Sequence, residues 1–582
     1  MKKNSVKILF FVAVFLSAFV VWYSPIIFKG YAPYKVSEQI ILAKNLHKSN
    51  FYSMESEKNV FLSSFIINEG GHLANTGNKL TTYLYFGLFS VTGVLDINDL
   101  LIFSIILNSL TLLIFSFIVY RMFGIGVSSV FSIFYILIPY NWQQIYSVGV
   151  YGFAVFFISL FFLLFFLWRE NSKKWVYLFG AGVALSLASL SREVFFLLIP
   201  VFFVYLFFPL KVGNEVSLVS LFRWSVKKLR LILPALVPVI LILSVFYIPS
   251  FIGKDGGNYY FNLFSSDAAS NQEFGDFNNY GHLYPDPYIY LFERESFLEN
   301  YTNKIGQSGF LESIQMKKVL MNLGEGSLSI AERGFLGIVL FTTHLMRFTS
   351  FGDVGGPFVL FFLLFGLIYL YEKDKGFYDF LLSWIFGVLF LLSFVVLVSR
   401  NHLRDFNWLI PLLLALGVLF LGKILSGSFG FSDIKKVVVV FILTILVSYN
   451  LLLANHTMFG KSYDSDRQLK LEVYAKVFKE KEVPDYEVIS LGLNSGDQVI
   501  LNYLADKTTV VLSEKTIKKL IKEERLQEVF SFFGVKHILG YGDELSQAIV
   551  DLTNTQNIAS SSIQVQKQPV SPLRSLVMNL IK

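Results

Sequence analysis

The sequence contains no cysteine, and only 7 of its 582 residues are histidine. The absence of cysteine excludes disulfide bonds, thiolate metal ligands and a cysteine nucleophile, and it does not identify a compartment. The histidines are scattered without a close pair at ligand spacing, so no local zinc motif is present. Charged residues are also scarce, at 16% of the chain.

Apolar residues are correspondingly abundant. They make up 54% of the chain, 63 residues are Phe, and the mean hydropathy is +0.58. A soluble core does not absorb this much apolar surface, so we expect a polytopic membrane protein. The net charge of +7 would suit nucleic acid, but Lys and Arg cluster at the ends of apolar runs, as orientation signals do. We therefore exclude a nucleic-acid partner.

Apolar runs of membrane-spanning length recur up to about residue 455. The first has a basic flank like a signal peptide but no small-x-small cleavage site, so we expect an uncleaved span. We predict eleven spans: 6–24, 99–120, 125–141, 149–168, 174–190, 194–209, 231–250, 356–371, 378–399, 407–425 and 436–454.

The cations between these spans predict the orientation. With a cytoplasmic N-terminus, the short outer connections hold only Arg192, Arg400 and Arg404. The inner connections carry Lys2, Lys3, Lys7, Arg121, Arg169, Lys173, Lys174, Lys211, Arg223, Lys227, Lys228, Arg230, Lys373, Lys375, Lys423, Lys435 and Lys436. The positive-inside rule therefore predicts a multi-pass protein of the plasma (inner) membrane with its C-terminal segment outside.

Residues 1–455 are predicted to form an all-α transmembrane bundle with large outer loops at 25–98 and 251–355. The first loop contains an apolar stretch at 80–95 that is too short to span and is expected in the interface. Residues 456–582 alternate strand-like and helical patterns, which predicts a small extracytoplasmic α/β domain. Its strands are expected at 486–492, 508–513 and 535–541, and its helices at 496–506, 515–533 and 543–553.

The stretch "APYKVSEQIILAKNLHKSNFYS" (32–53) directly follows the first span and is patterned as a helix. Ser37 suits the N-cap, and the apolar and polar residues divide between two faces. We expect an amphipathic helix on the outer membrane face with its apolar side in the interface. Glu38 lies in its first turn, where an acid pairs with the helix dipole or serves as a catalytic carboxylate. Glu69 is a second carboxylate candidate in this loop.

Two basic groups are predicted on the same outer side. Arg192 interrupts two apolar runs, and its guanidinium suits phosphate oxygens, although a turn compensated by Glu193 is the simpler alternative. Arg400, His402 and Arg404 lie within five residues, where they either extend to lipid headgroups or bind a phosphate. The aromatic run at 138–153 is expected in an interfacial belt, with Asn141 and Gln143 as alternative lining of a polar cavity.

This arrangement resembles the GT-C superfamily of integral-membrane glycosyltransferases, particularly the bacterial branch of protein mannosyltransferases and aminoarabinose transferases. The resemblance rests on "SEQIILAKNL", "NKLTTYLYFGLFSVTGV", "GAGVALSLASLSREVFFLLIPVFFVYLF" and "SRNHLRDFNWLIPLLLALGVLFLG". Members often begin the first outer loop with Asp or Asp-Glu where this chain has Ser37-Glu38, and no acidic pair marks a metal site. The resemblance therefore assigns no cofactor and leaves a divalent cation open.

The resemblance implies transfer of a sugar from a polyprenyl-phosphate donor to a glycan, lipid or protein acceptor on the outer face. Glu38 would be the catalytic carboxylate, with Glu69 in reserve, because a carboxylate can take a proton from the attacking hydroxyl. Arg400, His402 and Arg404, with Arg192 behind them, would bind the lipid phosphate. Two other classes stay open: a transporter or flippase for lipid-linked substrates, and a catalytically inert membrane scaffold.

Overall fold

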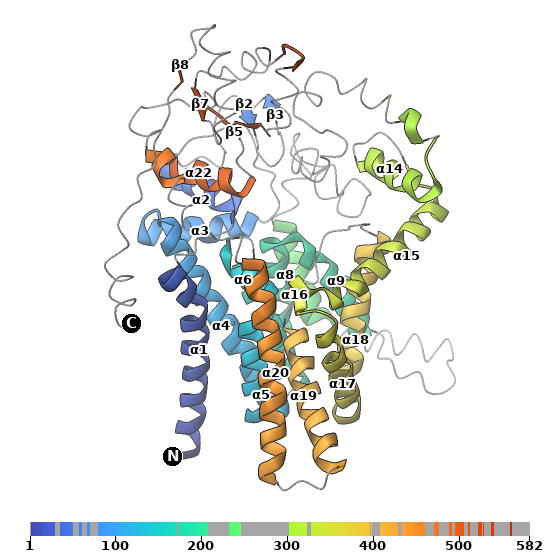
Figure 1. The fold of residues 1–582 in the computed structure, drawn as a ribbon. Coiled ribbons are helices and arrows are strands. Elements are labelled where there is room, and N and C mark those ends of the chain that lie inside the picture. The colour runs from blue at the N-terminus through green and yellow to red at the C-terminus, as the bar shows by residue number, and fades with distance from the viewer. Residues whose placement is uncertain are drawn as a thin grey trace.

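A computed structural model of the chain describes most of the helical bundle and the central part of the C-terminal segment (Figure 1). The described residues are 2–29, 35–49, 58–60, 67–69, 79–149, 151–171, 174–207, 232–245, 299, 302–305, 307–322, 327–395, 397, 408–428, 433–459, 471–476, 488–491, 495–505, 510–512, 522–525, 528, 537–539 and 559–560.

Helices dominate the described part. In the first half of the chain they are α1 (Lys2–Lys29), α2 (Glu38–Ser49), α3 (Lys79–Thr92), α4 (Ile97–Phe123), α5 (Ile125–Leu137), α6 (Pro139–Tyr146), α7 (Gly152–Glu170), α8 (Trp175–Ser191), η1 (Glu193–Leu197) and α9 (Leu198–Phe207). In the second half they are α14 (Phe310–Asn322), α15 (Ile330–Met346), η4 (Arg347–Thr349), α16 (Phe351–Val354), α17 (Pro357–Lys373), α18 (Lys375–Phe390), η5 (Leu391–Val395), α19 (Leu409–Ser428), α20 (Asp433–Phe459) and α22 (Ser495–Ala505).

Among the described residues, six helices are long and apolar enough to cross a membrane: Ser5–Phe28, Ile97–Phe123, Gly152–Glu170, Lys375–Val395, Leu409–Ser428 and Ile434–Asn455. The polytopic helical class is therefore confirmed, but the count of eleven spans is not. Three further predicted spans are the short apolar helices Trp175–Ser191, Val194–Leu206 and Ile232–Val245, and a fourth is the 17-residue α17. At 1.5 Å per residue, 17 residues rise about 25 Å, less than the roughly 30 Å hydrocarbon core.

The predicted span 125–141 is broken instead of straight. Helices α5 and α6 meet at a bend of 57°, at Pro139. Proline removes a backbone donor, so carbonyls before the break need other partners. Asn141 donates to Tyr135 O at 2.7 Å, and Asn455 of α20 donates to Leu137 O at 2.5 Å.

The carbonyl oxygen of Ile136, between Tyr135 and Leu137, accepts hydrogen bonds from two indole groups. Trp22 of α1 and Trp142 both donate their Nε1–H to Ile136 O, at 3.0 and 2.7 Å. Tyr140, Asn141, Trp142 and Tyr146 are buried. The prediction that this aromatic run forms an interfacial belt is therefore wrong for these side chains, because they close the helix break inside the bundle.

Helices α17 and α19 approach each other at two glycines. A Cβ on Gly366 would lie 2.0 Å from Leu413 O, and a Cβ on Gly417 would lie 2.0 Å from Phe362 O. Only glycine permits this backbone contact, which is the small-residue packing typical of membrane helices. The two helices lie side by side, with α20 on the other side of α19 (Figure 1).

Three short helices lie one above another across one end of the bundle, in the order α3, α2 and α22 (Figure 1). This loop end is opposite the N-terminal end of α1 (Figure 1). Helix α3 forms within the predicted interfacial stretch and exposes Tyr83 and Val91. Helix α2 instead buries Ile40, Leu42 and Ala43 completely. The predicted interfacial position of α2 is therefore wrong, because protein covers its apolar side.

Strands form within all three segments predicted in the C-terminal part. They are β5 (Val488–Leu491), β6 (Val510–Leu512) and β7 (His537–Leu539), which join β8 (Ala559–Ser560) in the all-parallel order β6-β5-β7-β8. The predicted helix 496–506 is α22, while 515–533 and 543–553 fall largely or wholly outside the described residues. A separate α/β domain stays a prediction, since Leu501 and Tyr503 of α22 belong to the same hydrophobic cluster as the bundle.

Candidate functional site

The predicted carboxylate Glu38 is the first residue of α2. The chain enters this helix through β1 (Lys35–Val36), which pairs in parallel with β4 (Ser147–Val148). Ser37 continues the pairing by donating its backbone N–H to Val148 O at 2.9 Å. Its hydroxyl accepts from the backbone N–H of Gln39 at 3.1 Å, which confirms the predicted cap. The start of α2 is thus fixed against the segment that follows α6.

Gly149 lets the segment that follows α6 pack closely against the first turn of α2. The residue has a positive φ of +82°, and a Cβ there would lie 2.5 Å from Ile40 Cδ1. A side chain at this position would overlap the Ile40 side chain and would be strained by the positive φ. The glycine therefore sets how closely the Glu38 helix start approaches residues 147–151.

Arg192 lies at the break between α8 and η1, as the sequence predicted for an interruption of two apolar runs. Its guanidinium carbon is 4.0 Å from the centroid of the Tyr151 ring, and its side chain is half-buried. This stacked geometry is a strong cation–π contact. The preceding residue, Ser191, accepts a hydrogen bond from Thr81 Oγ1 at 3.0 Å, which ties α3 to the same place.

The start of α2 and Arg192 both contact the short segment that follows α6. Val148 and Gly149 contact the start of α2, and Tyr151 contacts Arg192. An extended chain of five residues measures at most about 18 Å, which bounds the separation of these contacts. The first N–H groups of α2 and a guanidinium both favour a bound anion.

The described contacts do not test the other predicted site residues against this arrangement. Arg400, His402 and Arg404 lie outside the described residues, in the connection between η5 and α19. Glu69 is in β3 (Ile67–Glu69), which pairs antiparallel with β2 (Lys58–Val60). Within the described contacts, this two-stranded ladder joins neither Glu38 nor Arg192.

Metal ligands do not cluster in the described part of the chain. No three His, Cys, Asp or Glu side chains lie together there in a way that could hold an ion. The donor groups present among these residues thus do not fit a metal centre.

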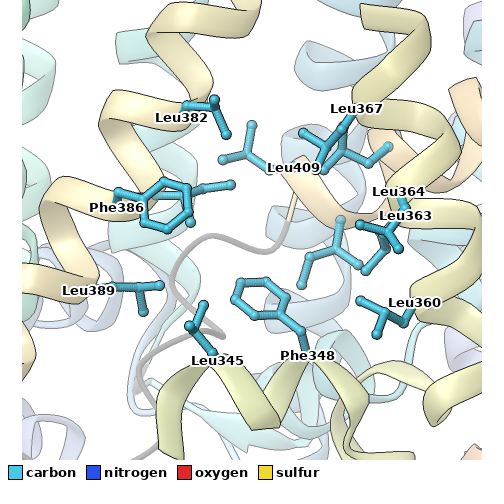
Figure 2. A pocket seen from close by; sticks show the side chains of 13 residues that line it. Leu345, Phe348, Leu360, Leu363, Leu364, Leu367, Leu382, Phe386, Leu389 and Leu409 are labelled. Atoms are coloured by element: carbon cyan, nitrogen blue, oxygen red, sulfur yellow. The ribbon is translucent and has the colours of Figure 1, made fainter. Parts of the chain in front are cut away.

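An apolar cavity of about 280 Å³ lies between α15, η4, α17, α18 and α19. Only Leu, Ile and Phe side chains line it, and they converge from all sides in Figure 2. The lining residues are Leu345, Phe348, Leu360, Leu363, Leu364, Leu367, Leu382, Ile385, Phe386, Leu389, Leu409, Ile410 and Leu413. Leu364 and Phe386 are about half exposed on the outer surface of the bundle, at 52% and 47%. The cavity therefore reaches the side of the bundle that a bilayer would cover.

The cavity was not foreseen from the sequence. Its residues have the same composition as the core of any apolar helix, so periodicity does not separate the two. Tyr151 and Thr81 were missed for a related reason, because their contacts with residues 191–192 depend on how distant helices meet. Tyr151 lay within the aromatic run at 138–153, and that run was the one available signal.

Burial raises the pKa of the Tyr85 phenol in α3, and neighbouring Tyr503 of α22 raises that pKa further. The phenol therefore stays protonated well above neutral pH. Tyr85 also contacts Phe153 edge-on, with 5.3 Å between ring centroids. A tyrosine of the C-terminal segment thus lies next to the aromatic residues that begin α7.

No protein-family model and no curated protein matches the chain. Solved membrane proteins do have a similar fold. The Archaeoglobus fulgidus oligosaccharyltransferase tethered with an acceptor peptide matches at TM-score 0.52 and 13% identity, over 91% of this chain and 68% of that one. The same protein with Zn and sulfate matches at 0.48 and 13%, over 85% and 62%. ArnT from Cupriavidus metallidurans bound to undecaprenyl phosphate matches at 0.39 and 12%, over 97% of both chains.

The match at TM-score 0.52 shows that the chain shares the fold of the archaeal oligosaccharyltransferase. The chain spans 62% to 68% of the length of that protein in these two structures. At the level of the fold, this likeness agrees with the predicted resemblance.

Proposed function

We propose that this chain, which has a GT-C-type fold, transfers a sugar from a polyprenyl-phosphate donor to an acceptor at the loop end of the bundle. The observation that supports the proposal is that one short segment contacts both groups: Val148 and Gly149 contact the start of the helix that carries Glu38, and Tyr151 contacts Arg192. A carboxylate and a cation on the same side of the bundle could supply the base and the phosphate ligand that such a transfer needs.

The apolar cavity supports a lipid-linked donor. Its walls include α18 and α19, and the connection between η5 and α19 carries Arg400, His402 and Arg404. A polyprenyl chain in an all-carbon cavity would gain the free energy of burying apolar surface. Its phosphate would then lie within reach of cations at the end of the same two helices.

The proposed reaction is a displacement at the anomeric carbon. Glu38 takes the proton of the acceptor hydroxyl as its oxygen bonds to that carbon, with Glu69 as the reserve base. The bond to the donor phosphate oxygen breaks, and the electron pair leaves with the polyprenyl phosphate. Arg400 and Arg404, assisted by His402 and Arg192, stabilise the charge that grows on this phosphate. The acceptor is a glycan, a lipid or a protein.

The topology belongs to the same proposal. The cation distribution puts the N-terminus in the cytoplasm and the loop end outside the plasma (inner) membrane. The 456–582 segment, whose α22 packs at the loop end, is then extracytoplasmic. The proposed reaction assigns no role to a divalent cation. Loss of transfer on chelation would show that it needs one, held by residues beyond the described part.

The transporter alternative has one feature in its favour, the broken helix at Pro139, because unwound helices often bind ions in transporters. Here the carbonyls of Tyr135, Ile136 and Leu137 all accept hydrogen bonds from protein side chains. They are therefore occupied in the structure, which favours a structural role for the break.

A transfer assay tests the function. Membranes containing the full chain would receive a panel of labelled polyprenyl-phosphate sugars, and transferred label would be measured for wild type, Glu38→Gln and Arg400→Ala. Loss of a general base typically lowers the rate about 10² to 10⁴-fold, which is the expected result for Glu38→Gln.

Glu170→Gln and Arg121→Ala are the matched controls. These residues form an exposed ion pair at 2.8 Å, at the end of α7 away from the loop end, so both variants should transfer sugar normally. Absence of transfer by wild type from every donor would refute the enzyme proposal. Normal transfer by Glu38→Gln would refute the assigned base and leave the reaction class standing.

A further inference from the structure

Lys44 is a buried cation in the middle of α2, with an exposed fraction of only 6%. Its Nζ donates a hydrogen bond to the main-chain oxygen of Tyr503 in α22 at 2.5 Å. The same Nζ lies 4.4 Å from the centroid of the Tyr503 ring. Burying an ammonium group costs several kcal/mol unless close partners compensate for its lost hydration. These contacts with α22 supply part of that compensation.

Tyr503 connects to a second element of the loop end. Its hydroxyl donates to the main-chain oxygen of Leu95, in the connection that follows α3. The residue is 3% exposed and lies next to Tyr85 of α3. One side chain of the C-terminal segment thus contacts both α2 and the connection that follows α3.

The start of α2 is fixed to the bundle. Ser37 pairs with Val148, and Ile40 packs directly against Gly149. Lys44 is six residues after Glu38, or about 9 Å along a helix that behaves as a rigid rod over this distance. The contacts at the start and at Lys44 together fix the direction of the helix, so loss of the Lys44 contact lets α2 tilt and lets Glu38 shift.

We propose that Lys44 and Tyr503 are positioning residues through which the C-terminal segment holds the helix that carries Glu38. Sugar transfer then depends on this segment through the position of α2. The inference rests on the proposed function, because the quantity that it sets is the place of the carboxylate. Displacement of a catalytic group by about 1 Å is enough to cost roughly a hundredfold in rate.

Substitution of Lys44 separates positioning from folding. Lys44→Met keeps the unbranched apolar stem and removes the ammonium group, so the helix retains its packing and loses its link to α22. We expect kcat to fall about tenfold or more while the KM for the donor is unchanged, because the donor phosphate ligands are elsewhere. Lys44→Arg retains a donor and should recover part of the rate. Tyr503→Phe retains the ring and the main-chain oxygen and should have a smaller effect.

The absence of cysteine supplies a readout independent of activity. Ala43 is fully buried beside Lys44, so Ala43→Cys introduces one thiol that should resist labelling. In the Lys44→Met background this thiol should label at least several times faster. A thiol from Ala184→Cys, buried in α8, should stay protected in both backgrounds and thus report any general loss of folding.

The outcomes separate the two proposals. Wild-type kcat in Lys44→Met, together with continued protection of the Ala43→Cys thiol, overturns the positioning role and leaves the proposed function intact. Absence of transfer by wild type overturns the proposed function and, with it, the positioning role. A selective loss of kcat with faster labelling at position 43 and none at position 184 is the result that the positioning pair predicts.

Discussion

The first two helices of the chain have opposite relations between composition and burial. Helix α1 is almost entirely apolar, yet Ile8, Leu9 and Val20 are more than 60% exposed on the surface of the bundle. Helix α2 has the polar sequence "EQIILAKNLHKS", yet Leu42 is fully buried and Lys44 nearly so. In a membrane protein an exposed apolar side chain has lipid as its solvent, whereas a buried polar one has protein partners. In these two helices, the polar sequence therefore belongs to the one that other parts of the protein cover.

The largest expected effect comes from truncating the same side chain in each helix. Leu42→Ala removes a fully buried side chain from α2 and should lower the free energy of unfolding by about 2 to 5 kcal/mol. Leu9→Ala, at a position 68% exposed, should change it by about 0.5 kcal/mol or less. Thermal unfolding in detergent measures both. Equal losses would show that α2 is not packed as described.

A smaller effect is expected where α1 does contact the bundle. Trp22→Phe removes the indole that donates to Ile136 O, while Trp142 continues to donate to the same oxygen. We expect a loss of about 1 kcal/mol, typical of one hydrogen bond between membrane helices. Trp175→Phe is the control, because that indole is 59% exposed at the start of α8. A loss from Trp22→Phe no larger than from Trp175→Phe would contradict the role given to this bond.

The smallest effect is expected at the start of α15, which is exposed, whereas the start of α2 is buried. Ser329 and Glu332 form a capping box at the start of α15, and Lys317 Nζ lies 2.7 Å from Glu332 Oε1. Hydrogen bonds from Lys317 and Ser329 lower the pKa of Glu332 to about 2. A carboxyl whose folded pKa is depressed stabilises the fold above its ordinary pKa, and this contribution disappears as pH falls from about 4.5 to about 2.

Glu332→Gln should therefore weaken amide protection in the first turn of α15 at neutral pH, by less than about 1 kcal/mol because the pair is near the surface. The difference from wild type should vanish near pH 2. Hydrogen exchange, corrected for the intrinsic rate at each pH, measures it. A difference that persists undiminished at pH 2 would contradict the assigned pKa.

Local pattern predicted much of the fold. The long apolar helices, the Ser37 cap and the three C-terminal strands depend on residues close in sequence, and the structure has them at the predicted places. Helices α14, α15 and α16 are an exception, because they lie in the segment 251–355 that was predicted as an outer loop. The burial of α2 could not be predicted in this way, because the Lys44–Tyr503 hydrogen bond joins residues 459 positions apart. The α5–α6 break depends on equally distant partners, since Trp22 and Asn455 are 114 and 318 residues from the carbonyls that they satisfy.

The candidate site likewise combines features that depend on local sequence with features that depend on distant contacts. Charge at the ends of apolar runs was enough to select Glu38 and Arg192, which the structure places at opposite ends of one five-residue segment. The contact of the Arg192 guanidinium with the Tyr151 ring and the position of α22 above α2 could be seen only in the three-dimensional structure. The catalytic and phosphate-binding roles remain proposals for the assays above.

The most direct test of the central claim is a product balance in proteoliposomes that contain the purified full chain, a membrane extract as the source of acceptor, and one labelled polyprenyl-phosphate sugar. A glycosyltransferase releases one polyprenyl phosphate for each sugar transferred, so the account predicts equal amounts of the two products. Movement of intact donor across the bilayer with no released polyprenyl phosphate would instead identify a flippase and contradict the account.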